Sequence, residues 1–173
     1  MAITIDERKM SERQNEHIRK MLSPINAKIA VEKKIDTDCI RFFAKDTSVS
    51  DIKVFFKTDN ENIRANYFEI WKPVASRKWT LQKLYFKIKV KEGFDLTTEV
   101  LSFHVDFDVV DDTYKKYPHI HIKHPTIECI SNAHIPLNLN DLSDISSSIE
   151  KFNDNVSKIL IAINKEFITP FKL

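Results

Sequence analysis

A two-residue alternation of apolar and polar side chains in the middle of the chain constrains its fold more than any other feature. Residues 83–91 hold apolar side chains at every second position, namely Leu84, Phe86, Ile88 and Val90. Residues 100–110 repeat the pattern with Leu101, Phe103, Val105, Phe107 and Val109. Because successive side chains of a strand point to opposite faces, both segments are predicted to be strands with one face in a core and the other in water.

Further aromatic and β-branched runs extend this pattern into an antiparallel sheet. Strands are expected over residues 40–43, 52–57, 65–71 and 117–123, with turns at 46–48 and 111–112 and a loop at 72–78. Residues 52–57 and 65–71 are expected to be antiparallel neighbours. The sequence therefore predicts a meander of about five to six strands over residues 39–137.

Helices are predicted at both ends of this meander. Residues 6–22 are rich in helix formers and carry a thin apolar stripe made of Met10, Ile18, Met21 and Leu22. Ser23 and Pro24 indicate that a second short helix follows, with Ile25 and Ile29 facing inward, so residues 6–34 are expected to be helical. One kinked helix is the alternative.

The clearest helix is predicted over residues 141–168. Its apolar residues recur at spacings of three and four, and they are Leu142, Ile145, Ile149, Phe152, Val156, Ile159, Ile163 and Phe167. Asn140, Asp141 or Ser143 is expected to cap it. Such a stripe either covers a sheet or forms a coiled-coil dimer, and we favour packing on the sheet. The prediction is a single α+β domain over residues 1–173.

Composition excludes several classes of function and sets an expected compartment. Gly93 is the only glycine, which excludes the glycine-rich phosphate loops of Walker and dinucleotide-binding folds. A formal charge of +2 requires that any anionic partner be bound by local clusters of cations. We expect a cytoplasmic protein without membrane contact, because we find neither a signal-peptide pattern nor a spanning stretch. Cys39 and Cys129 are expected to be reduced thiols.

The histidines are strongly clustered. Five of the six, His104, His119, His121, His124 and His134, fall within 31 residues. Because His119 and His121 lie two residues apart on a predicted strand, their imidazoles are expected to share a face. If this strand pairs with the one that holds His104, the side chains of His104, His119 and His121 converge on one face of the sheet. An extended segment can bring His134 to the same patch.

General acid/base catalysis is the first chemistry that fits this cluster. A pair of imidazoles, His119 and His121, can take a proton from a ribose 2′-hydroxyl and return one to the leaving oxygen. The other candidate catalytic residues are His104, His134 and Asp106. The candidate substrate-binding residues are the cations Lys83, Lys87, Lys89 and Arg77, the last of which lies near two tryptophans that can stack nucleobases.

Three other interpretations stay open. A transition metal, such as zinc, would find ligands in His119, His121 and His134, with a carboxylate from Asp106 or Glu128. Cys129 would be a nucleophile if a histidine activated it. In the structural interpretation, the histidines and lysines are ordinary outward residues of a half-buried sheet.

Residues 117–124, which read Tyr-Pro-His-Ile-His-Ile-Lys-His, and residues 133–137, which read Ala-His-Ile-Pro-Leu, precede the closing helix. These segments resemble small bacterial proteins of toxin–antitoxin and phage-defence loci, among them TumE-type toxins. The resemblance covers about the last third of the chain, and the N-terminal helices and long meander depart from those shorter proteins. It implies an action on RNA, with His119, His121 and His134 as the matching residues.

Two functions follow from the sequence. The first is a cytoplasmic bacterial enzyme, either a toxin or a phage-defence protein, that acts on RNA, a nucleotide or another phosphodiester through the histidine-rich face. The second is a non-catalytic module that binds a larger protein or forms a homodimer through the charged N-terminal helix or the lysine face. No long loop that would close over a pocket is predicted, which weighs against the enzyme.

Overall fold

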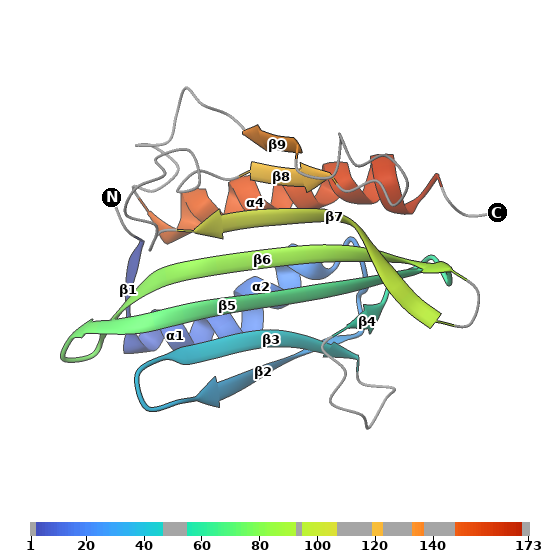
Figure 1. Cartoon of the computed structure of the whole chain (residues 1–173). Helices are drawn as coiled ribbons and strands as arrows, with labels where there is room; N and C mark the ends of the chain where they lie inside the picture. Colours follow the sequence, from blue (N-terminus) through green and yellow to red (C-terminus); the bar gives the residue numbers. More distant parts are fainter. Residues whose placement is uncertain are drawn as a thin grey trace.

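The protein is an α+β fold in which helices lie on one side of an antiparallel sheet (Figure 1). The structure is a computed structural model that describes residues 3–46, 55–92, 95–106, 119–122, 133–136 and 148–170. The helical elements are α1 (Glu7–Glu12), η1 (Arg13–His17), α2 (Ile18–Leu22), α4 (Ile149–Ile163) and η4 (Asn164–Ile168), where η marks a π-helical turn. The predicted fold class is confirmed.

The sheet is a meander with more strands than the sequence predicts. Its main strands follow the order β2 (Ile29–Ile35), β3 (Ile40–Asp46), β5 (Ile63–Ala75), β6 (Lys78–Glu92), β7 (Asp95–Asp106), β8 (His119–Ile122) and β9 (Ala133–Pro136). In addition, β1 (Thr4–Asp6) pairs with β6, and β4 (Phe56–Lys57) pairs antiparallel with β5 as expected. The described residues thus form nine strands rather than five or six.

The prediction of a second N-terminal helix is wrong. Residues 7–22 form one run of α1, η1 and α2, and the chain then enters strand β2 at Ile29. Ile29 and Val31 are buried and alternate with less buried residues, which is the period of a strand. Strand β2 pairs antiparallel with β3 from Ile29 to Ile35, and this ladder satisfies the backbone groups that point toward β3. Ile25 and Ile29 are nevertheless buried, as expected.

The loop predicted at residues 72–78 is also wrong. Strand β5 continues to Ala75 and β6 begins at Lys78, so the connection is a tight turn at residues 76–77. Arg77 adopts a positive φ of 58°, the left-handed conformation that short hairpin turns require. Pro73, which lacks a backbone N–H, lies where the register shifts. The strands therefore extend past the proline.

Helix α4 buries its apolar stripe against the sheet side of the molecule. It begins at Ile149 with Ser148 as its N-cap, whose Oγ accepts from the Lys151 N–H at 3.2 Å. The predicted start at residue 141 and the caps Asn140, Asp141 and Ser143 are therefore wrong for this helix; residues 137–147 lie outside the described residues. The buried face consists of Ile149, Phe152, Val156, Leu160 and Ile163. The prediction that the stripe packs within the chain is confirmed.

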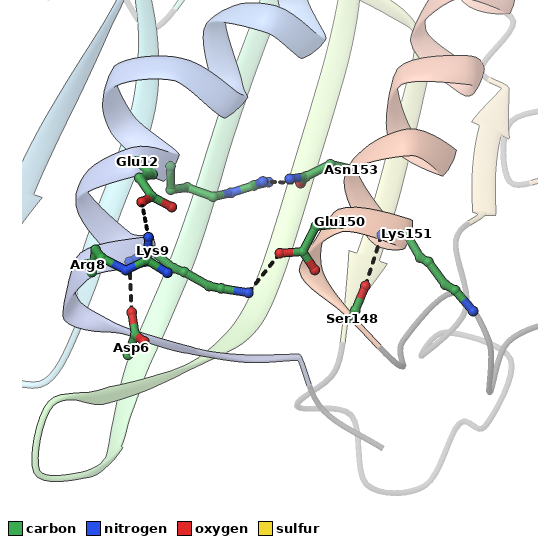
Figure 2. A network of polar contacts seen from close by, with 9 residues as sticks. Asp6, Arg8, Lys9, Glu12, Ser148, Glu150, Lys151 and Asn153 are labelled. Atoms are coloured by element: carbon green, nitrogen blue, oxygen red, sulfur yellow. Dashed lines mark hydrogen bonds and ion pairs between the residues drawn. The ribbon is translucent and has the colours of Figure 1, made fainter.

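Polar contacts join the N-terminal helical run to α4 (Figure 2). Lys9 Nζ donates to Glu150 Oε1 at 2.7 Å. The Lys9 hydrogen bond and the backbone N–H of Glu150 lower the pKa of this carboxyl to about 2. About one helical turn further along each helix, Arg13 Nη1 donates to Asn153 Oδ1. The two ends of the chain therefore pack together on one face of the sheet.

Candidate functional site

The candidate site lies on the face of the sheet opposite α1, α2 and α4, which we call the outer face. Strand β6 shows how the faces alternate, because Leu84, Phe86 and Ile88 are buried in the core whereas the residues between them are half-buried on the outer face. Among the described residues, no helix covers the outer face (Figure 1). The sequence-predicted histidines and lysines lie along β6 to β9.

The predicted convergence of the histidine strands is confirmed by the backbone register. Strand β7 pairs with β8 so that His104 is opposite His119, and β8 pairs with β9 so that His121 is opposite His134. The rings of His119 and His121 are tilted by 45° with centroids 4.8 Å apart. Four histidine positions thus lie on three neighbouring strands, and two imidazoles are adjacent.

The histidine end of the outer face is less exposed than the sequence predicts. His119 is 2% exposed and Ser102, which is opposite His121, is 1% exposed. His121 is half-buried, and its Nε2 atom is buried. One physical reason is that β8 is not an edge strand, because β9 pairs along its other side. The expectation of a wet histidine face is therefore wrong for His119.

The candidate substrate-binding cations divide into two places. Lys83, Lys87 and Lys89 all lie on the outer face of β6, and Lys87 is in register with Ser102 of β7. Arg77 lies in the β5–β6 turn, more than about 20 Å along the strand from the histidine row, and 3.7 Å from Glu7. The structure thus brings the lysines to the histidines and leaves Arg77 apart.

An aromatic row joins this site, and the sequence analysis did not assign it a role. Phe43 of β3 is opposite Phe68 of β5, Phe68 is opposite Tyr85 of β6, and Tyr85 is opposite His104. The rings of Phe68 and Tyr85 stack, with centroids 4.7 Å apart and planes 18° from parallel. Lys87 Nζ lies 5.9 Å from the Tyr85 ring centroid. The sequence contained one sign of this row, because Tyr85 occupies an outward-facing position in the alternating pattern of its strand.

The metal hypothesis depends on side chains that the structure describes only in part. Within the described side chains, no group of three or more histidine, cysteine or acidic residues is arranged to hold a metal ion. His104, Asp106 and His134 are described by their backbone register alone, and His124, Glu128 and Cys129 lie outside the described residues. The zinc site and the Cys129 nucleophile therefore stay predictions.

A second polar cluster lies on the opposite side of the sheet, where the sequence predicted only core and a charged helix surface. Arg13 and Glu69 are both fully buried. Arg13 Nε donates to Glu69 Oε2 at 2.9 Å, and Trp71 Nε1 donates to the same oxygen at 2.7 Å. The Tyr67 hydroxyl donates to Glu69 Oε1. This network satisfies the buried carboxylate and ties η1 to β5, so we assign it a structural role.

Burial and charge shift two pKa values in this network. Burial alone would lower the pKa of Arg13, but the Glu69 carboxylate and the Tyr67 hydroxyl raise it above its ordinary value. Burial, followed by the negative charge of Glu69, raises the pKa of Tyr67 well above 10.0. Arg13 is therefore cationic and Tyr67 is protonated in the folded protein.

Tyr67 is expected to make the protein less stable in alkali. Because its pKa is raised in the folded state, the folded chain binds more protons than the unfolded chain above about pH 10, so the free energy of unfolding falls as pH rises through that value. Urea unfolding across this range measures the slope. Tyr67→Phe is expected to have a shallower slope, and equal slopes would contradict the assignment.

No protein-family model, curated protein or solved structure significantly matches this chain. Within the described segments, no helix is long and apolar enough to cross a membrane. A function must therefore be inferred from the arrangement of the chain's own residues, and the resemblance to TumE-type toxins stays a prediction.

Proposed function

We propose that this protein cleaves phosphodiester bonds in RNA at the histidine end of the outer face, with His119 and His121 as the acid/base pair. The observation that carries the proposal is the adjacency of these two imidazoles, whose ring centroids are 4.8 Å apart. The lysines of β6 lie two strands away and supply positive charge for a phosphate. The resemblance to TumE-type toxins supports the same substrate and a role in a bacterial toxin or phage-defence system in the cytoplasm.

The proposed reaction needs two proton transfers. One neutral imidazole removes the proton of the ribose 2′-hydroxyl, and the 2′-oxygen attacks the adjacent phosphorus. The bond from phosphorus to the 5′-oxygen breaks, and the protonated second imidazole gives its proton to that leaving oxygen. The products are a 2′,3′-cyclic phosphate and a 5′-hydroxyl. Because His119 is more buried than His121, we expect the substrate to reach His121 first.

The test is an RNA-cleavage assay with histidine variants. His119→Gln and His121→Gln are each expected to lower the cleavage rate by about 100-fold or more, because glutamine cannot exchange a proton near neutral pH. His17→Gln is the matched control, since His17 is a half-buried histidine in η1, outside the outer face. Its rate should equal that of the wild-type protein.

Two further measurements make this test decisive. Thermal unfolding of each variant separates loss of chemistry from loss of fold, and a 2′-deoxy nucleotide at the cleaved position should block the reaction completely. Cleavage that survives both histidine substitutions, or a wild-type chain that cleaves no RNA with or without added zinc, would refute the proposal.

Zinc is the alternative way to use the same residues. His119 and His121 would be two ligands and His134, opposite His121 in the register, the third. A bound zinc ion would supply an activated water or polarise a phosphoryl oxygen. Elemental analysis of the wild-type protein and of a folded His119→Ala/His121→Ala double variant distinguishes the two schemes, because zinc that is present in the first and lost in the second assigns the metal site.

The burial of His119 supports the second function, a non-catalytic module. A side chain that is 2% exposed can act as a packed element of the sheet rather than as a reacting group. Such a module would bind a larger protein, or a second copy of itself, through the N-terminal helical run or the lysines of β6. Its complex would survive His121→Gln, and this outcome together with absent RNA cleavage would favour the module.

A further inference from the structure

We infer that two copies of this chain associate through the free edge of strand β2, so that the sheet of one copy continues antiparallel into the sheet of the other. This association goes beyond the proposed RNA cleavage, because it uses the border of the sheet at the other end of the strand order from the histidines. Within the described part of the chain, β2 pairs with β3 on one side and with no strand on the other (Figure 1).

The backbone of β2 has hydrogen-bonding groups that point away from β3. The Asp36 N–H donates to the Cys39 carbonyl at 2.9 Å, so these two residues form a hydrogen-bonded pair across the hairpin. Such pairs recur at every second residue of an antiparallel ladder. The even-numbered residues of β2 therefore bond to β3, and Val31, Lys33 and Ile35 direct their N–H and C=O groups to the free edge.

Part of this edge is open to solvent. The Val31 carbonyl accepts a hydrogen bond from Gln14 Nε2 at 3.4 Å, which agrees with its direction away from β3. Beyond this point Lys33 and Lys34 are exposed, and Ile35 is 70% exposed, more than any other large apolar side chain of the described residues. A strand added here would cover Ile35 and pair the free backbone groups.

The charges of β2 favour a second copy of the same strand in one register. A two-fold axis through Lys33, perpendicular to the sheet, places Glu32 of each copy opposite Lys34 of the other. Two pairs of opposite charge then form on the outer face, and Ile35 of each copy lies opposite Val31 of the other on the helix side. An axis through Glu32 or Lys34 would instead place like charges directly opposite each other, which is destabilising.

Lys33 opposes this register, because it lies opposite itself at the axis. Lysine on an edge strand commonly limits edge-to-edge pairing, and here it weakens the contact without removing the four favourable cross-strand pairs. The contact is also small, so we expect a reversible dimer. Because the same edge is used in both copies, the association is closed at two chains and does not extend into a fibre.

Sedimentation velocity of the full chain tests the association. The wild-type protein should pass from monomer to dimer between about 5 and about 500 µM, the range of a small, transient interface. Ile35→Lys should weaken the dimer at least about tenfold, because it removes an apolar cross-strand pair twice. Val74→Lys is the matched control, since Val74 is 57% exposed and lies outside β2, and it should change nothing. Thermal unfolding confirms that both variants are folded.

A mixing experiment tests the charge pairs. Glu32→Lys and Lys34→Glu should each weaken self-association by about tenfold, because each change turns both opposite-charge pairs into like-charge pairs. Within each chain, Glu32 also pairs with Lys45 and Lys34 lies near Asp36, so each variant alone alters an intrachain contact as well. An equimolar mixture of the two variants should nevertheless associate again, since their new charges complement each other only between chains.

Two changes at Lys33 test the register itself. Lys33→Gln removes the repulsion at the axis and should tighten the dimer by about threefold. Residues of a hydrogen-bonded antiparallel pair have Cα atoms about 5.5 Å apart, which a disulfide can span. Lys33→Cys should therefore give a covalent dimer on oxidation. Lys20→Gln and Lys20→Cys, at an exposed lysine of α2, carry the same native cysteines and should show neither effect.

Each outcome bears on the inference independently of RNA cleavage. A wild-type chain that stays monomeric at about 500 µM overturns it. So does a dimer that Ile35→Lys leaves intact, or variants at Glu32 and Lys34 that fail to associate when mixed. A dimer that Lys33→Gln weakens also contradicts it. His121→Gln should leave the association unchanged whether or not the protein cleaves RNA, because its strand lies at the far end of the strand order.

Discussion

Arg13→Met is expected to destabilise the protein by about 3–5 kcal/mol, the cost of leaving a buried carboxylate without its cation. Arg13 and Glu69 are both fully buried, so water cannot replace the lost guanidinium. Trp71 and Tyr67 still donate to Glu69, but two neutral donors do not balance its charge. Urea unfolding measures the effect. A loss below about 1 kcal/mol in the free energy of unfolding would show that the Arg13–Glu69 ion pair does not stabilise the folded state.

A matched control and a double variant identify the cause. Arg8→Met removes an arginine of the same helical run, whose ion pair with Glu12 is largely exposed, and it is expected to cost less than about 1 kcal/mol. Arg13→Met/Glu69→Gln removes both charges, and the amide keeps one oxygen to accept from Trp71 while its NH2 group can donate to the Tyr67 hydroxyl. It should recover much of the lost stability, because a neutral pair carries no unpaired buried charge. A double variant less stable than Arg13→Met would contradict this explanation.

Most of the sheet could be predicted from the sequence because each strand has one buried face. The alternation around Leu84 and Leu101 identifies strands β6 and β7 without any knowledge of their neighbours. Strand β2 was missed because Ser23 and Pro24 form a local helix-start pattern, whereas its pairing with β3 is a tertiary feature. Local signals were therefore reliable where burial repeated over many residues, and less so where one pairing decided the structure.

The candidate site was predictable in part for the same reason. His119 and His121 are two residues apart, so their shared face follows from strand geometry alone. The position of Phe68 opposite Tyr85 depends on the β5–β6 register, which a bulge near Ile70 shifts. The burial of Arg13 was not visible because its partner, Glu69, is 56 residues away in the sequence. Contacts between distant strands and helices carry information that composition and periodicity do not contain.

Leu160→Ala is expected to destabilise the protein by about 2–5 kcal/mol, because Leu160 is fully buried on the inner face of α4. The sequence pattern assigned the inner position to Ile159, which the structure shows as only partly buried. Alanine is the best helix former, so the loss measures packing rather than helix propensity. Urea unfolding at constant m-value gives the difference in the free energy of unfolding.

The next residue supplies the control for this prediction. Ile161 is 39% exposed, and Ile161→Ala is expected to change stability by less than about 1 kcal/mol. Ile159→Ala should fall between the two. The loss in the free energy of unfolding should therefore decrease in the order Leu160, Ile159, Ile161. This order shows which side of α4 faces the sheet. If Ile161→Ala or Ile159→Ala costs more than Leu160→Ala, α4 is rotated about its axis, and its contacts with Lys9 and Arg13 through Glu150 and Asn153 must change with it.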